Sequence, residues 1–97
     1  MMHRIETFEV RKEGLDAARK AVAAFADEVG RKEGGTASFL ALQETDAPTR
    51  FALVMAFRVP SAAQYHDGTA WAKRFRETIA PLCVQPPEAR SLAPVAP

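Results

Sequence analysis

Few side chains in this 97-residue sequence are suited to chemistry at neutral pH. The chain has two histidines, His3 and His66, and a single cysteine, Cys83. The histidines form no i, i+4 ligand pair, and no zinc-type spacing surrounds the cysteine, so we expect no metal site. A lone histidine can still accept a proton, because the ordinary pKa of its ring lies near neutrality.

The charge of the chain argues against partners chosen by bulk electrostatics. Thirteen basic and 12 acidic residues give a formal net charge of +1, which supplies no field to attract nucleic acid or anionic lipid. No run approaches the roughly 20 apolar residues of a membrane span, and the N-terminal segment MMHRIETFEV lacks the apolar stretch of a signal peptide. One cysteine permits no intrachain disulfide. We expect a cytoplasmic protein without nucleic-acid or membrane partners.

The elements that must position these residues begin with a strand, a helix and a second strand. Alternating residues predict a strand near 3–11, and the segment TASFLALQE predicts another at 36–44. Between them an apolar residue recurs every three or four positions, which predicts an amphipathic helix of about four turns, closed by Gly34-Gly35. The residues at this spacing are Leu15, Ala18, Val22, Phe25 and Val29.

The second half of the chain predicts a broken helix and a last strand. Ser61 and Gln64 fit a capping box, which predicts that a short helix starts at Ser61 and ends at Gly68. Thr69 is suited to cap a final helix, which Pro81 limits or bends. A strand follows near 88–92. The apolar residues that share one face of the final helix are Trp71, Phe75, Ile79 and Leu82.

The segment FALVMAF, at 51–57, predicts a strand that is buried on both faces. It is short for a helix, and its apolar residues do not alternate with polar ones, so neither face suits water. The chain's own helices can cover one face of the sheet, but the other needs a separate cover. A second copy of the same chain is the simplest cover, which predicts a homodimer.

The order of these elements defines the expected fold class. Strand, helix, strand, strand, helix, strand is the ferredoxin-like β-α-β-β-α-β pattern, an α+β fold with an antiparallel sheet and helices on one face. We expect a single domain at 1–93 and a loose C-terminal tail at 94–97. Two such domains packed sheet against sheet would form a dimeric α+β barrel.

Several segments, in order and spacing, resemble one known family. They are TFEVRKEG at 7–14, the EGG before the second strand, DAPTRFALVMAFR at 46–58, AAQYH ending at His66, and IAPLCVQPPEARSL at 79–92. Over nearly its whole length the chain resembles the antibiotic biosynthesis monooxygenases, small dimeric α+β barrels that include quinol monooxygenases.

The resemblance implies a reaction and a set of site residues. Members oxidise electron-rich phenols or hydroquinones with O2 and need no metal, haem or flavin, so it implies no cofactor and a small aromatic substrate. Such a reaction needs a dry cavity, a base and donors for an oxyanion. His66 matches the family's histidine on the short helix and is the expected base. The residues expected to bind the substrate are Thr7, Met55, Phe57, Arg58, Tyr65, Trp71 and Phe75.

Several of these residues also have a purely structural interpretation. His66 can hydrogen-bond a backbone carbonyl at the mouth of a barrel, and Trp71 and Phe75 sit at core spacing on the final helix. A threonine such as Thr7 suits a strand whatever it binds. Arg58 and an arginine of the last strand, Arg90, can hold an anionic substrate or remain solvated.

The chain also departs from the family pattern. Met55 stands where many relatives carry Glu, which removes a carboxylate from the expected cavity, and Phe57 replaces the usual Trp or Tyr. The stretch from Thr69 to Trp71 occupies the region of a second histidine. Arg76 lies where the haem-degrading branch has its axial histidine, so haem ligation at that site is not expected.

Two alternatives to an enzyme follow from these observations. Because the catalytic equipment is sparse, the chain can instead be a non-catalytic dimer that binds a small ligand, or a vestigial relative. The same strand order occurs in RNA-binding domains, and 50–54 faintly resembles their third strand. However, the glycine after the basic residue is absent, Leu53 replaces a stacking aromatic, and the charge is near neutral. We therefore do not expect RNA binding.

Overall fold

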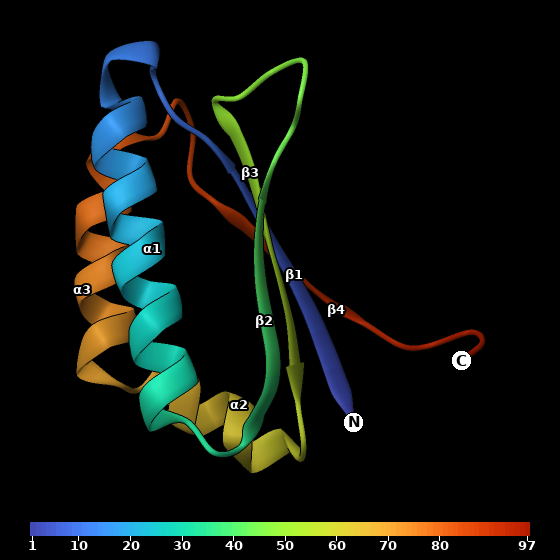
Figure 1. Cartoon of the computed structure of the whole chain (residues 1–97). Helices are drawn as coiled ribbons and strands as arrows, with labels where there is room; N and C mark the ends of the chain where they lie inside the picture. The colour runs from blue at the N-terminus through green and yellow to red at the C-terminus, as the bar shows by residue number, and fades with distance from the viewer.

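The computed structural model describes all 97 residues and has a four-stranded antiparallel sheet with the order β2-β3-β1-β4 (Figure 1). This arrangement confirms the ferredoxin-like α+β fold. No helix is both long enough and apolar enough to cross a membrane. The elements are β1 (Met2–Glu9), a 3-10 turn (Lys12–Gly14), α1 (Leu15–Lys32), β2 (Thr36–Gln43), β3 (Arg50–Phe57), α2 (Pro60–Asp67), α3 (Ala70–Ile79), a 3-10 turn (Ala80–Leu82) and β4 (Glu88–Leu92).

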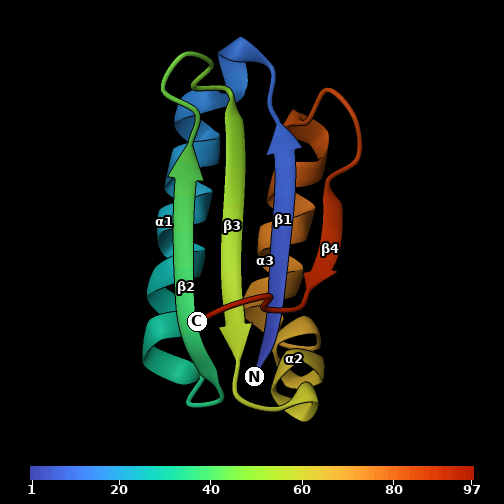
Figure 2. The ribbon, with the colours of Figure 1, turned by 90° about the vertical axis from the view of Figure 1, so that its right-hand side faces the viewer.

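The helices cover only one face of the sheet. α1 and α3 run side by side against it, and α2 lies beneath the end of β3, at the same end of the sheet as the start of β1 (Figures 1 and 2). Aromatic rings pack within each layer and between the layers. Phe25 of α1 stacks on Phe75 of α3 with centroids 4.4 Å apart, and Phe8 of β1 stacks on Phe51 of β3 at 5.0 Å. Between the layers, Phe8 meets Phe75 edge-on at 6.1 Å. The opposite face, which we call the open face, is turned toward the viewer in Figure 2.

β3 shows why the sequence of this strand lacks alternation. Leu53, Met55 and Phe57 are at most 1% exposed and face the helices. Val54 points to the open face, where Leu40 of β2 lies opposite it in the register and is 55% exposed. Each face of the strand is therefore apolar, but within one chain only one of the two faces is covered.

The helix boundaries largely follow the expected signals, with one correction. Thr69 caps α3 by accepting a hydrogen bond from the backbone N–H of Ala72 at 3.1 Å. The capping box predicted at Ser61 does not form. α2 begins at Pro60 and its N-cap, Val59, makes no side-chain cap bond. Proline has the backbone angle of a first helical residue and lacks the N–H that a cap would satisfy, so the helix starts one residue earlier.

Candidate functional site

His66 lies in the last turn of α2 and is only 3% exposed. Its ring packs between two phenylalanines, with centroids 5.4 Å from Phe25 of α1 and 5.3 Å from Phe57 of β3. An imidazole in such an apolar setting needs hydrogen-bond partners for its nitrogens. The position of those partners decides which nitrogen can do chemistry.

Glu33, the residue that follows α1, is the hydrogen-bond partner of one of these nitrogens. Its side chain is 1% exposed, and its carboxylate is 2.8 Å from His66 Nδ1. The same carboxylate accepts hydrogen bonds from Trp71 Nε1 at 2.5 Å and from Thr36 Oγ1 at 2.7 Å. An ionised carboxylate only accepts, so Nδ1 carries the ring proton and Nε2 of neutral His66 is left as an acceptor.

His66 also lines a cavity of about 640 Å³ between α3 and the β1–β4 side of the sheet. The chain offers Nε2 no hydrogen-bond partner, while Nδ1 is bound to Glu33. A buried carboxylate that orients a histidine whose other nitrogen is free is the arrangement of a general base. The cavity is lined by Arg4, Glu6, Phe25, His66, Asp67, Ala72, Phe75, Arg76, Ile79, Ala80 and residues 87–91 of the β4 segment.

The polar wall of this cavity is organised around Asp67. Arg4 of β1 donates two hydrogen bonds to the Asp67 carboxylate, at 2.6 and 3.0 Å. Although burial opposes ionisation, the hydrogen bonds and positive charge of Arg4 hold the pKa of Asp67 below its usual value. Arg76 of α3 donates to the Asp67 backbone carbonyl at 3.2 Å and has no carboxylate partner. Arg4 is thus neutralised, whereas Arg76 keeps a free charge.

The structure brings several of the sequence-predicted residues together around His66. Phe57 touches its ring and Trp71 shares its carboxylate partner. Phe75 is 4% exposed and lines the cavity. Met55 is 1% exposed and belongs to the core on the helix side of the sheet, although it does not line the cavity.

Other predicted residues lie apart from His66. Arg58 is exposed and donates to the Gly34 carbonyl at 3.0 Å. Tyr65 is 58% exposed, and its ring makes a T-shaped contact with Trp71 with centroids 6.4 Å apart. Arg90, at the edge of the cavity, is in register with Ile5 and so projects toward the open face. The second histidine, His3, has the same strand parity as Ile5, and its Nδ1 is enclosed without a partner.

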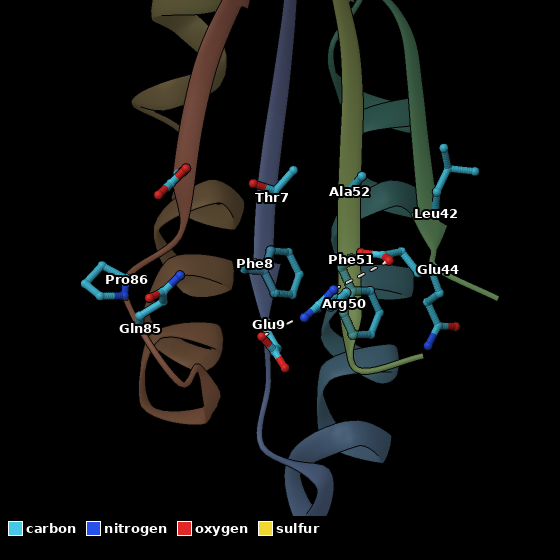
Figure 3. Close-up of a pocket in the computed structure, with 12 residues that line it drawn as sticks. Thr7, Phe8, Glu9, Leu42, Glu44, Arg50, Phe51, Ala52, Gln85 and Pro86 are labelled. Atoms are coloured by element: carbon cyan, nitrogen blue, oxygen red, sulfur yellow. Dashed lines mark ion pairs between the residues drawn. The ribbon is translucent and has the colours of Figure 1, made fainter. Parts of the chain in front are cut away.

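Thr7 lies in a separate hollow of about 580 Å³ at one end of the open face. Figure 3 shows Arg50 in this hollow between Glu9 and Glu44, at 3.7 and 3.9 Å. Neither histidine nor cysteine lines it. These long, half-exposed ion pairs add little stability, and the hollow offers no base.

Sequence reasoning missed two carboxylates of the site, Glu33 and Glu6. Glu33 continues the buried stripe of α1, four residues after Val29, and a charged residue at a core position is a signal of a buried partner. Although Met55 supplies no carboxylate, Glu33 and Glu6 therefore supply two to the site. Sequence reasoning missed Glu6 because apolar residues occur on both faces of β1, so the pattern does not show which face borders the cavity.

Comparison with known proteins agrees with this fold. No protein-family model and no curated protein matches the chain. Among solved structures, a Nitrosomonas europaea protein named as an antibiotic biosynthesis monooxygenase is 27% identical, with a TM-score of 0.92 over 99% of this chain and 100% of that one. Rv0793 of Mycobacterium tuberculosis is 23% identical, with a TM-score of 0.90 over 99% and 96% of the two chains.

A Caulobacter crescentus protein that also bears the antibiotic biosynthesis monooxygenase name is 17% identical, with a TM-score of 0.90 over 98% and 90% of the two chains. The fold and the histidine–carboxylate pair define a small ferredoxin-like α+β protein with a cavity between sheet and helices. The chain has the antibiotic biosynthesis monooxygenase fold over its full length, which confirms the resemblance that its sequence motifs indicate.

Proposed function

We propose that this protein is a cofactor-independent monooxygenase that oxidises a small aromatic quinol or a polyketide-type phenol with O2. The observation that carries this proposal is the buried Glu33–His66 pair, which leaves His66 Nε2 unpaired at the wall of a cavity of about 640 Å³. A cavity of that size accommodates a small aromatic molecule. The names of the structurally similar proteins support the same class of reaction.

The residues of the cavity suit the first step of such a reaction. Nε2 removes a hydroxyl proton from the substrate, and the Glu33 carboxylate stabilises the positive charge that the ring of His66 gains. The resulting phenolate is electron-rich and reduces O2. One oxygen atom bonds to the ring of the substrate and the other leaves as water. A hydroquinone and O2 thus give a hydroxyquinone and water, without an external reductant.

The working unit that we propose is a homodimer in a reducing, cytoplasmic setting. On the open face, Leu40 and Leu42 of β2 are 55% and 45% exposed, and Leu92 at the end of β4 is 46% exposed. Apolar strand residues of this kind mark an association surface. The only cysteine, Cys83, is buried and unpaired, which fits a protein that needs no disulfide.

Oxygen uptake by chelator-treated protein tests this function. With a panel of naphthohydroquinones, we expect consumption of O2 above the uncatalysed rate, and a loss of at least about 100-fold in kcat for His66→Ala. Lys73→Ala, on the exposed side of α3, is the control and should keep full activity. If no hydroquinone in the panel accelerates O2 uptake and His66→Ala matches the wild type, the monooxygenase proposal fails. Ligand binding without O2 uptake would instead favour the non-catalytic binding module.

A further inference from the structure

Glu6 of β1 is a titratable group of the cavity that the proposed base step does not use. It lines the same cavity as His66, and the chain supplies no hydrogen bond to its carboxyl group. Its neighbours across the sheet are Leu53 of β3 and Ala89 of β4, neither of which has a polar side chain. A half-buried carboxyl without a partner is costly unless it is protonated or meets a ligand.

The charged groups around Glu6 come from three elements. Arg4 lies on its own strand, His66 and Asp67 lie on α2, and Arg76 lies on α3. Burial raises the pKa of Glu6 above its usual value and the negative charge of Asp67 adds to this effect, while the positive charges of Arg4 and Arg76 offset it only in part. Arg4 is already committed to Asp67 by two hydrogen bonds.

The charged residues of β4 face elsewhere. Glu88 and Arg90 are in register with Thr7 and Ile5, which have the opposite strand parity to Glu6. Their side chains therefore project toward the open face. On the cavity side, β4 presents Ala89 next to Glu6, so a small side chain leaves space beside the carboxyl group.

We infer that Glu6 contacts the substrate: in its protonated form, the carboxyl group donates a hydrogen bond to an oxygen atom of the bound molecule while His66 Nε2 accepts a proton from a hydroxyl group. This inference rests on the proposed function and narrows its substrate class. The cavity then suits an aromatic compound with a hydroxyl group for His66 and a separate acceptor oxygen for Glu6. Hydroquinones and hydroxyquinones carry both, whereas a simple phenol has only one oxygen.

Binding of duroquinone tests the role of Glu6 without turnover. This quinone neither titrates nor can be oxidised further, and quenching of Trp71, the only tryptophan, reports its binding. We expect Glu6→Ala to weaken binding about tenfold. Glu6→Gln keeps a donor and should bind within about threefold of the wild type. Glu9→Gln, on the open-face side of the same strand, should change nothing in the cavity.

The pH dependence separates a contact from a structural effect. Affinity of the wild type should fall as pH rises through the raised pKa of Glu6, because an ionised carboxylate cannot donate. In Glu6→Gln this fall should disappear, and it should persist in His66→Gln. If Glu6→Ala binds duroquinone as tightly as the wild type does, or if the pH profile of binding is unchanged in Glu6→Gln, the inference is overturned even if O2 uptake is observed. If these effects on binding are observed but the protein consumes no O2, only the proposed oxidation is overturned.

Stability gives a readout that needs no ligand. Since the folded protein raises the pKa of Glu6, it binds more protons than the unfolded chain between the two pKa values. The contribution of Glu6 to stability is thus fully present below its unfolded pKa and is lost as pH rises through the folded pKa. Urea unfolding of Glu6→Gln should lack this loss. If the wild type and Glu6→Gln lose stability in parallel as pH rises, the Glu6 carboxyl group does not hold the proton in the folded protein as we infer.

Discussion

At the scale of single residues, the most constrained side chain of the site is Glu33. Two oxygens receive hydrogen bonds from His66, Trp71 and Thr36, and the carboxylate is almost fully enclosed. Glu33 acts through His66, so it is a positioning residue. Its charge stabilises the protonated imidazole, and its geometry keeps the proton on Nδ1 and the lone pair on Nε2.

We predict that Glu33→Gln lowers kcat by at least about 100-fold, because the amide removes the negative charge and presents N–H groups to side chains that are themselves donors. Binding of duroquinone should change by less than about threefold, since Glu33 does not line the cavity. Steady-state O2 uptake and Trp71 quenching measure the two effects. Glu77→Gln, an exposed carboxylate on α3, is the matched control. Equal losses in kcat and in affinity would indicate general damage to the fold and contradict a positioning role.

The sequence reveals some of these residues and hides others for physical reasons. His66 stands out because ionisable rings are rare in the chain. Its pairing with Glu33 joins residues 33 positions apart, and such a contact exists only after α1 and α2 have packed. The sequence also does not determine which face of β1 packs against the helices. Ile5 favours one face and Phe8 the other, so Thr7 and Glu6 are equally plausible residues of the cavity.

At the scale of elements, the site depends on how closely α2 approaches the turn between α1 and β2. A Cβ built on Gly35 would lie 2.6 Å from the Cβ of Ala62 on α2, whereas one built on Gly34 meets nothing within 4 Å. The sequence predicts this glycine pair as a helix end. The structure adds that Gly35 is required for a close approach between elements, and neither glycine has a positive φ.

We predict that Gly35→Ala destabilises the protein by about 1–3 kcal/mol, because the added methyl group forces α2 away from the turn. The shift also moves His66 relative to Glu33, so O2 uptake should fall. Gly34→Ala is the matched control and should stay within about 0.5 kcal/mol of the wild type. Urea unfolding measures both variants.

Removing the opposing methyl group tests the cause of that loss. In the double variant Gly35→Ala with Ala62→Gly, the close contact is relieved, although glycine in a helix costs about 1 kcal/mol. A double-mutant cycle should therefore show a favourable coupling between the two substitutions. If the losses in the free energy of unfolding are strictly additive, contact with Ala62 is not the reason that position 35 requires glycine.

At the scale of the whole molecule, the helices of a single chain cover only one of the two faces of the sheet (Figure 2). β3, in contrast, is apolar on both sides. The C-terminal residues after Leu92 lead away from the sheet on its uncovered side (Figure 1). The sequence predicts this two-sided strand correctly, because the absence of alternation depends on composition alone. It does not indicate which residues face which side, since that depends on the register with β1 and β2.

We predict that Leu40→Glu prevents self-association. Leu40 is 55% exposed within one chain and faces outward opposite Val54, so the substitution costs the folded chain little. In a sheet-to-sheet dimer the same carboxylate would be buried without a partner, at a cost of several kcal/mol, which weakens association at least about 100-fold. Val59→Glu, at a residue 51% exposed outside the sheet, is the matched control.

Sedimentation equilibrium at tens of micromolar separates the two outcomes, because the chain mass is 10.6 kDa and the dimer has twice that value. The wild type and Val59→Glu should both sediment as dimers and Leu40→Glu as a monomer with unchanged circular dichroism. A stable dimer requires roughly 1,200–2,000 Å² of buried surface, and the open face is where the exposed strand leucines Leu40, Leu42 and Leu92 lie. A wild type that remains monomeric at these concentrations, or a Leu40→Glu variant that dimerises normally, would show that the second face of β3 is tolerated in water and that the cavity of one chain is the complete site.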